Sequence, residues 1–278
     1  MTRFAVLLLL FVLVLPAVSR AEPPLVLDGA FIQGGLVQGQ TAPGAEVKLD
    51  GKKVPVAGDG RFLIGFGRTA APAARLEVSH AGGGTVARDL AIEQRTYAEQ
   101  RIDGLPKRKV RPNADDLKRI RDEQAIINRA RGVYSAAPAF DSGFVWPAQG
   151  PISGVYGTAR FLNGEPRQPH YGVDVAAPTG TPVTAPADGT VTMAHPDMFF
   201  TGMTVIVDHG RGLNSTFLHM SEISVAEGQA VRQGDMIGRI GATGRVTGPH
   251  LDWRINLRDQ RLDPALLVGP MTPAAKGQ

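Results

Sequence analysis

The 278-residue chain contains no cysteine. Disulfide bonds and a thiolate zinc site are therefore excluded, and any metal must be bound by histidine, aspartate or glutamate. Aromatic residues make up only 6% of the chain, whereas it has 34 glycines and 21 prolines, which favours short strands and many turns. Lysine is missing between Lys118 and Lys276. This excludes a lipoyl- or biotinyl-type carrier, which needs a lysine on a hairpin tip.

The sequence has no clear excess of either positive or negative charge. The formal net charge is +4, and Arg3 and Arg20 supply two of these charges. The chain after residue 21 therefore carries 28 basic and 26 acidic residues. So balanced a chain does not indicate nucleic acid as a partner.

Only the N-terminus carries a long apolar run. It occupies residues 4–15, follows Arg3 and is followed by Pro16 and small residues up to Ala21. This pattern predicts a secretory signal peptide at residues 1–21, cleaved after Ala21, and hence a periplasmic or secreted protein. An uncleaved membrane anchor is the alternative, but the run is short for a hydrocarbon core of ~30 Å. After cleavage we expect no stable membrane span.

The residues that follow indicate a mostly β protein with two β parts. Short alternating runs separated by turn signals such as Asp50-Gly and Asp59-Gly predict a small β-sandwich domain at residues 22–96. It offers no catalytic constellation, so we interpret it as a spacer or docking module. Residues 144–268 again read as short strands with frequent glycine and proline, without a helical pattern. They predict an antiparallel β-sheet folded on itself, followed by a flexible tail at 269–278.

A linker with one helix is predicted between them, at residues 97–143. Asn113 is a suitable N-cap for a helix over residues 114–131, and Asp115 and Asp116 lie in its first turn. Arg129 and Arg131 lie in its last turn, before a glycine. We expect a largely solvated helix, because its apolar stripe is incomplete.

The candidate chemistry lies in the second β part. His170 and Asp174 are four residues apart in a glycine-flanked loop, so both can reach one ion. His250 and Asp252 alternate along an expected strand, which places their side chains on the same face. His219 ends another expected strand and can point into the same cleft. A catalytic zinc needs about three protein ligands and one open position, which this set can supply.

At these residues the sequence resembles the LytM/lysostaphin-like zinc metallopeptidases. The family pattern of His-x-x-x-Asp is met by His170-Tyr-Gly-Val-Asp174, and the later lone histidine by Thr216-Phe-Leu-His219. The terminal Gly-Pro-His-Leu-His is met in part by Gly248-Pro-His250-Leu-Asp252. The resemblance covers roughly residues 144–268 with the motifs in the same order. It implies a LytM-like barrel-sandwich domain there.

The resemblance implies that His170 and Asp174 are zinc ligands and that His219 and His250 are catalytic. Asp252 occupies the third ligand position, where the family has histidine. Aspartate can bind zinc at ~2.0–2.2 Å, but its side chain is shorter. Alternatively, His250 becomes a ligand, or metal binding is lost. With two carboxylates the ligand charge would cancel that of the dication, and the metal would acidify its bound water less effectively.

The implied function is that of an exported zinc metalloendopeptidase that hydrolyses peptide crosslinks between peptidoglycan stem peptides. Arg160 and Asn163, shortly before His170, are candidate contacts for substrate carboxylate or carbonyl groups. A second possibility is a catalytically impaired LytM-like domain that binds peptidoglycan, or that activates a partner amidase or another envelope protein. His209, at a turn before Gly210, is interpreted as structural.

Overall fold

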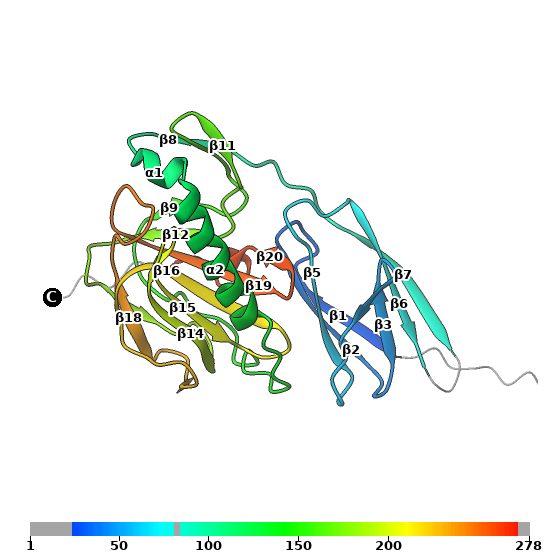
Figure 1. The fold of residues 1–278 in the computed structure, drawn as a ribbon. Coiled ribbons are helices and arrows are strands. Elements are labelled where there is room, and N and C mark those ends of the chain that lie inside the picture. Colours follow the sequence, from blue (N-terminus) through cyan, green and yellow to red (C-terminus); the bar gives the residue numbers. More distant parts are fainter. Residues whose placement is uncertain (1–23, 81–83, 272–278) are drawn as a thin grey trace, which may run out of the picture.

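The computed structural model describes residues 24–80 and 84–271. The expected signal peptide and residues 272–278 of the expected tail lie outside the described residues. Two β parts are joined by a segment with a short and a longer helix (Figure 1), which confirms the mostly β fold. Among the described residues, no helix combines the length and apolarity that a membrane crossing requires.

The N-terminal part is built from seven strands in two antiparallel sheets, with strand orders β1-β2-β5 and β4-β3-β6-β7. The strands are β1 (Leu25–Gly29), β2 (Leu36–Thr41), β3 (Glu46–Leu49), β4 (Lys52–Val54), β5 (Arg61–Gly65), β6 (Ala73–Ser79) and β7 (Thr85–Ala91). Their alternating apolar residues form one core, which includes Val37, Val47, Ile64 and Leu76.

The turn predicted at Asp50-Gly51 connects β3 to β4. Both residues have positive φ, 48° and 75°, as a two-residue hairpin turn of the primed type requires. Glycine and aspartate adopt this backbone at low cost, so the local sequence fixes the hairpin register without help from the core.

The linker contains β8 (Glu99–Ile102), α1 (Lys107–Val110) and α2 (Ala114–Arg131). The predicted helix is confirmed in both bounds, and Asn113 and Asp116 form a reciprocal capping box at its start. Two features differ from the expectation of a free linker. β8 pairs in parallel with β10 (Ala159–Leu162), and α2 packs Ile126, Ile127 and Ala130 against the C-terminal part.

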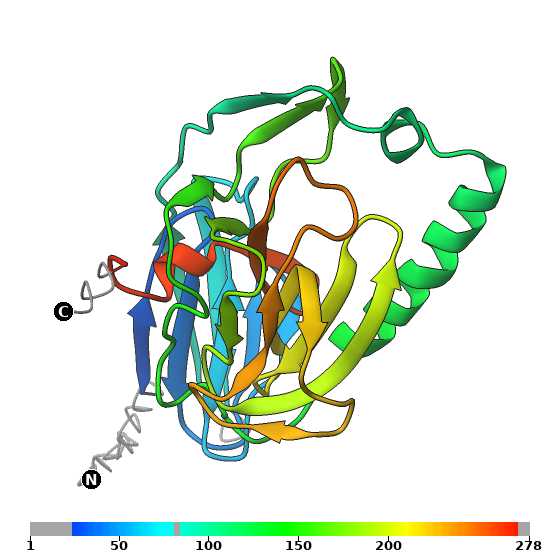
Figure 2. The same ribbon diagram turned by 90° about the vertical axis from the view of Figure 1, so that its left-hand side faces the viewer.

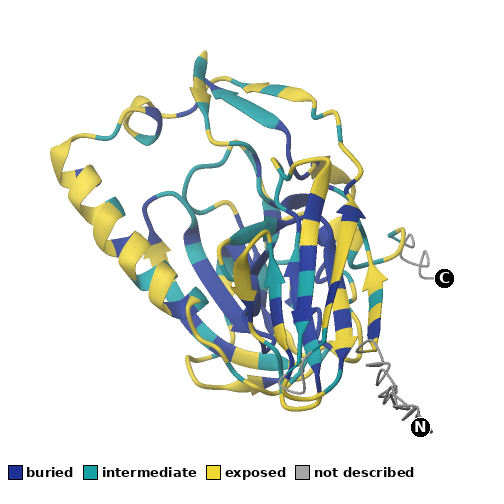
Figure 3. Cartoon of the chain, turned by 90° about the vertical axis from the view of Figure 1, so that its right-hand side faces the viewer, coloured by how far each residue is buried: buried dark blue, intermediate teal, exposed yellow. Residues whose placement is uncertain are grey.

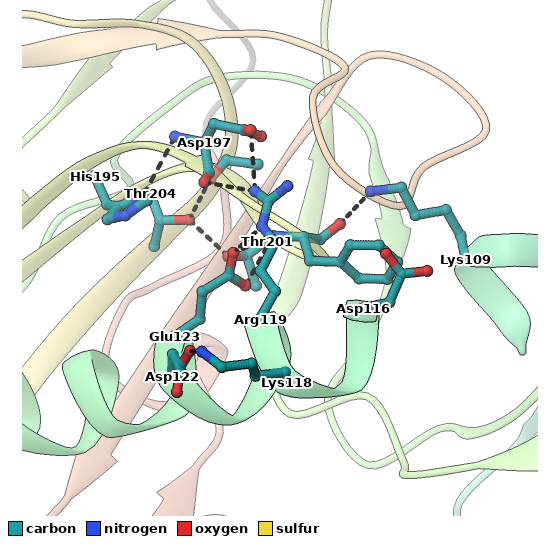
Figure 4. Close-up of polar contacts among 12 residues, drawn as sticks. Lys109, Asp116, Lys118, Arg119, Asp122, Glu123, His195, Asp197, Thr201 and Thr204 are labelled. Carbon is teal, nitrogen blue, oxygen red and sulfur yellow. Dashed lines mark hydrogen bonds and ion pairs between the residues drawn. The ribbon is translucent and has the colours of Figure 1, made fainter. Parts of the chain in front are cut away.

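Polar contacts hold α1 and α2 on the hairpin between two strands, β14 (Gly189–Met198) and β15 (Gly202–Asp208) (Figure 4). The Glu123 carboxylate accepts hydrogen bonds from the Phe199 backbone N–H at 2.8 and 3.0 Å. Arg119 donates to Asp197 and to Glu123, and Lys109 donates to the Phe199 carbonyl. The linker is thus part of the C-terminal unit.

The C-terminal part is built around a ten-stranded antiparallel sheet, in which the path β17-β14-β15-β16-β19-β12-β9 is extended by β13, β18 and β20. Its strands are β9 (Ile152–Gly154), β12 (Val173–Ala176), β13 (Pro182–Thr184), β14 (Gly189–Met198), β15 (Gly202–Asp208), β16 (Leu213–Ile223), β17 (Ala230–Val231), β18 (Met236–Ile240), β19 (His250–Leu257) and β20 (Gln260–Leu262). A 3-10 helix, η1 (Pro264–Leu266), follows. A separate small sheet joins β8 to β10 (Ala159–Leu162) and β11 (Glu165–Arg167), above the large sheet in Figure 2.

The main core lies inside the folded sheet, where most residues of the central strands β15, β16 and β19 are buried. In the N-terminal part, buried and exposed residues alternate along the strands (Figure 3). Trp253 and Phe217, on neighbouring strands, are fully buried in the main core. The core also includes Leu36 and Leu63 of the N-terminal part, and the Arg258 guanidinium donates to the Leu63 carbonyl at 3.1 Å. The central strands are therefore a rigid support for the side chains at their ends.

Candidate metal centre

Strand register brings the candidate ligands together. Asp174 on β12 lies directly opposite Asp252 on β19, and Asp252 lies opposite Leu218 on β16. Cross-strand neighbours on one face are about 5 Å apart between Cβ atoms. The two carboxylates are therefore neighbours although 78 positions separate them in the sequence, and His219 follows one residue later on the third strand.

His170 lies just before β12 and is held by its backbone, which bonds Thr158 and Gly157 at 2.9 and 2.7 Å. Its Nε2 is 3.0 Å from Asp174 Oδ1, and its Nδ1 is 3.9 Å from Asp252 Oδ2. One ligand atom from each of the three residues can be chosen so that all lie within 4.8 Å of one another, and all three residues are buried. The structure thus brings the three proposed ligands together.

Each carboxylate also contacts an arginine. Arg160 donates to Asp174 Oδ2 at 2.7 Å. Arg254 donates to both oxygens of Asp252, at 2.9 and 2.6 Å, in a bidentate pair. Such charge-assisted fork contacts are among the strongest hydrogen bonds in proteins.

Both carboxyls remain ionised at neutral pH. Burial and the charge of Asp252 raise the pKa of the Asp174 carboxyl, but His170 and Arg160 lower it by more, so that it lies below its usual value. Burial likewise raises the pKa of Asp252, and the charges of Arg254 and His170 more than reverse the effect. The ligand set therefore carries two negative charges without any change of protonation.

His219 and His250 face each other beside this cluster, with ring centroids 4.9 Å apart. His219 Nδ1 is 2.8 Å from the Thr243 carbonyl oxygen, and His250 Nδ1 is 2.9 Å from that of Gly248. A carbonyl only accepts, so the proton of each neutral ring lies on Nδ1 and leaves Nε2 as the acceptor. His250 Nε2 is 3.9 Å from Asp174 Oδ1, close to the ligand cluster.

His219 is a neutral imidazole in a strained backbone position. Burial lowers its pKa to about 4, so the ring is uncharged near pH 7. It occupies a position with φ of 67°, which is costly for a residue with a side chain. Its backbone N–H donates to the Thr201 carbonyl at 2.9 Å, which helps to hold this conformation.

The donor set fits a zinc ion. His170 Nδ1, His170 Nε2 and Asp174 Oδ1 are buried without a hydrogen-bond partner among the residues that the structure describes. Leaving such groups unpaired costs about 1–3 kcal/mol each, and a bound cation would remove part of this cost. One histidine and two carboxylates are ordinary zinc ligands, and a tetrahedral ion at ~2.0–2.2 Å needs only small movements from the observed separations.

Two glycines make room for the carboxylates. A Cβ atom at Gly154 would lie 2.2 Å from Asp174 Oδ2, and one at Gly172 would lie 2.3 Å from Asp252 Oδ1. Side chains at either position would push a carboxylate out of the cluster. The glycines of the sequence motif thus have a steric function in this site.

The two expected substrate contacts have other partners in the structure. Arg160 contacts Asp174, and its Nε also donates to Gln100 at 3.3 Å. Asn163 bonds the backbone of Leu105 through both amide atoms, at 3.1 and 2.9 Å. These contacts give Arg160 a supporting role at the metal cluster and Asn163 a role in the β10–β11 turn, whereas their contact with substrate stays a prediction.

Arg254 is the functional residue that the sequence analysis missed. It stands two positions after Asp252 in a strand and hence on the same face, a pattern that was available in the sequence. With Arg160 it also corrects the expected charge balance. Two guanidinium groups offset the two carboxylates, so the charge of a bound dication would not be cancelled.

A family described as Peptidase family M23 matches residues 168–264. The DD-carboxypeptidase/endopeptidase Mpg of Neisseria meningitidis is 42% identical over 101 residues, 36% of this chain and 23% of Mpg. The peptidoglycan DD-endopeptidase ShyA of Vibrio cholerae is 46% identical over 105 residues, 37% of this chain and 24% of ShyA. The match thus spans about a quarter of each of these curated relatives.

A solved structure extends the similarity beyond the catalytic segment. It is described as a peptidase M23 from Pseudomonas aeruginosa, and it is 33% identical with a TM-score of 0.64. The match covers 85% of this chain and 94% of that one, so it includes strands outside the metal cluster. Sequence motifs, site geometry and fold agree, and the chain belongs to peptidase family M23.

Proposed function

We propose that the protein is a zinc-dependent metalloendopeptidase that hydrolyses peptide crosslinks of peptidoglycan outside the cytoplasm. The observation that carries this proposal is the pair of facing histidines, His219 and His250, each with Nδ1 bonded to a backbone carbonyl. The pair lies beside the cluster of His170, Asp174 and Asp252. The name of ShyA, a peptidoglycan DD-endopeptidase, supports the substrate class.

In this proposal His170, Asp174 and Asp252 hold the ion, and Arg160 and Arg254 hold the two carboxylates in place. A bound zinc supplies a Lewis acid that polarises the scissile carbonyl and acidifies water. The Nε2 atom of His219 or His250 accepts the proton of the attacking water, and the resulting imidazolium can return it to the leaving amine. The low pKa of His219 keeps it in the accepting form over the neutral range.

The location follows from the substrate. The polymer lies outside the cytoplasmic membrane, and the expected signal peptide at residues 1–21 provides the export.

The test is digestion of isolated sacculi by the chain from residue 22, purified with zinc. Release of uncrosslinked muropeptides, detected by mass spectrometry, is expected, and His250→Ala should reduce the rate by two orders of magnitude or more, about 10²–10⁴-fold. His80→Ala, in the N-terminal part, is the matched control and should retain the rate. No release from sacculi by zinc-loaded protein would contradict the proposal.

The second candidate is an impaired domain that binds peptidoglycan or activates an amidase. The observation that favours it is Asp252 in a ligand position with both oxygens already bonded to Arg254. Sedimentation with sacculi without muropeptide release, together with stimulation of an added cell-wall amidase, would support it over hydrolysis.

A further inference from the structure

The two carboxylates of the metal cluster do not stabilise each other. Asp174 and Asp252 are directly opposite on neighbouring strands, and both are buried. Like charges directly opposite in a sheet are destabilising, and burial increases the cost because water screens them poorly. The fold therefore needs compensating positive charge near this pair whenever no metal is bound.

Two arginines supply this charge from the protein itself. Arg160 contacts Asp174 at 2.7 Å and Arg254 contacts Asp252 at 2.6 Å, so two positive charges balance two negative ones. The side chain of Asp252 is 1% exposed, and that of Arg254 is 23% exposed. Each carboxylate of the cluster is therefore paired with a guanidinium of the protein itself.

A divalent ion at this site would have to share the Asp252 carboxylate with the Arg254 guanidinium. Both oxygens of Asp252 accept from Arg254, so the ion would bind to lone pairs whose negative charge the guanidinium has partly offset. A carboxylate or carbonyl behind a histidine ligand raises the basicity of that ligand. A guanidinium has the opposite effect on an anionic ligand, and it also repels the ion directly.

We propose that Arg254 sets the metal affinity of this site, weakening zinc binding and making the metal-free state stable, so that the protein exchanges its ion instead of holding it permanently. This inference rests on the proposed zinc function for the identity of the ion. It goes beyond that function, because it assigns to a residue outside the ligand set the control of how tightly the ion is held.

The test compares zinc dissociation constants of the chain from residue 22, measured by competition with a chromogenic chelator. R254Q keeps a hydrogen-bond donor near Asp252 but removes the charge, and we expect it to bind zinc at least about tenfold more tightly, about 1.4 kcal/mol. R254K keeps the charge and should stay within about threefold of the wild type, a difference well below 1 kcal/mol.

A matched control is available in the linker. Arg108 forms a second bidentate pair with a buried aspartate, Asp116, at 2.7 and 2.6 Å. R108Q removes an equivalent pair that is not part of the metal cluster, so it should leave the zinc dissociation constant unchanged. A change in R108Q as large as in R254Q would overturn the proposal, because the effect would then be general destabilisation.

Thermal stability gives an independent readout. In chelator, R254Q should melt at a lower temperature than the wild type, because Asp252 loses its partner opposite Asp174. On addition of zinc its melting temperature should rise by more than that of the wild type. If R254Q folds only with zinc, its release of zinc into excess chelator is measured instead, and slower release than from the wild type is expected.

Zinc binding by R254Q that is equal to or weaker than that of the wild type would overturn the proposal, as would release at an equal or faster rate. So would tight binding by R254K, since the charge would then not be the cause. None of these measurements depends on hydrolysis. Absence of muropeptide release together with the expected affinity change would contradict the proposed function alone.

Discussion

His209 makes the stability of this protein depend on pH in a direction that the structure fixes. The ring is completely buried, and it bonds the Asp188 carbonyl through Nδ1 and the Ser215 hydroxyl through Nε2, both at 2.7 Å. Ser215 in turn accepts from Trp253 Nε1 at 3.3 Å. A second proton on His209 would break the bond to Ser215 or reorient its hydroxyl within the core.

Burial lowers the pKa of His209 from 6.5 to about 4. Between these two values the unfolded chain binds the proton and the folded chain does not, so stability falls as the pH falls. The contribution is complete above about pH 6.5 and is lost progressively toward pH 4. At about 1.4 kcal/mol per pH unit, this histidine accounts for roughly 3 kcal/mol, as an order of magnitude.

His219 has a similarly lowered pKa of about 4, so the metal-free wild type should lose about twice this amount over the same range. The assay is urea unfolding in chelator, followed by tryptophan fluorescence, at steps of about one pH unit from about 7.5 to 4.5. His209→Gln keeps a donor and an acceptor but does not titrate. We expect this variant to be less stable than the wild type at the highest pH of the series. Its free energy of unfolding should change with pH about half as much as that of the wild type.

The reasoning is refuted if the free energy of unfolding of His209→Gln depends on pH as steeply as that of the wild type. That result would mean that His209 is protonated, or reaches water, in the folded protein, contrary to its burial. A wild-type stability that is flat between about pH 6.5 and 4.5 would refute the reasoning for both histidines.

Three further predictions concern packing and the site. Gly172→Ala should lower the zinc content of the purified protein severalfold in elemental analysis, because the added Cβ atom would lie 2.3 Å from Asp252 Oδ1. Gly58→Ala, at a position with open space around it, should leave the zinc content unchanged. Trp253→Ala should lower the free energy of unfolding by about 3–5 kcal/mol in denaturant titration, since the ring is fully buried; a loss below about 1 kcal/mol would contradict the core packing described. Glu123→Gln should cost about 1–3 kcal/mol of unfolding free energy, because the carboxylate accepts twice from Phe199; unchanged stability would show that α2 is not fastened there.

Features with a local cause were predictable from the sequence. The helix α2 begins directly after Asn113, because the free N–H groups of a helix N-terminus need acceptors and the Asn113 side chain supplies one. It ends before Gly132. The Asp50-Gly51 hairpin follows from two residues that tolerate positive φ. The five site residues were recognisable from motifs whose spacing is preserved, and the structure brings all five together.

Features that depend on pairing between distant segments were not predictable in this way. β8 joined β10 although its four residues carry no signal for a partner, since a strand pairs with whatever edge the rest of the fold leaves open. In α2, Leu117 is 46% exposed although it is apolar, because Ile126, Ile127 and Ala130 define the face that meets the C-terminal part.

By itself the sequence determined the β-rich class, the helix and the set of side chains available to hold a metal, because composition, turns and caps act over a few residues. Only the tertiary structure decided that Asp174 lies opposite Asp252, and that Arg160 and Arg254 neutralise them. Strand register and side-chain pairing over tens of residues arise from burial of the whole core. The electrostatic character of the site is therefore a property of the folded sheet, not of the motif.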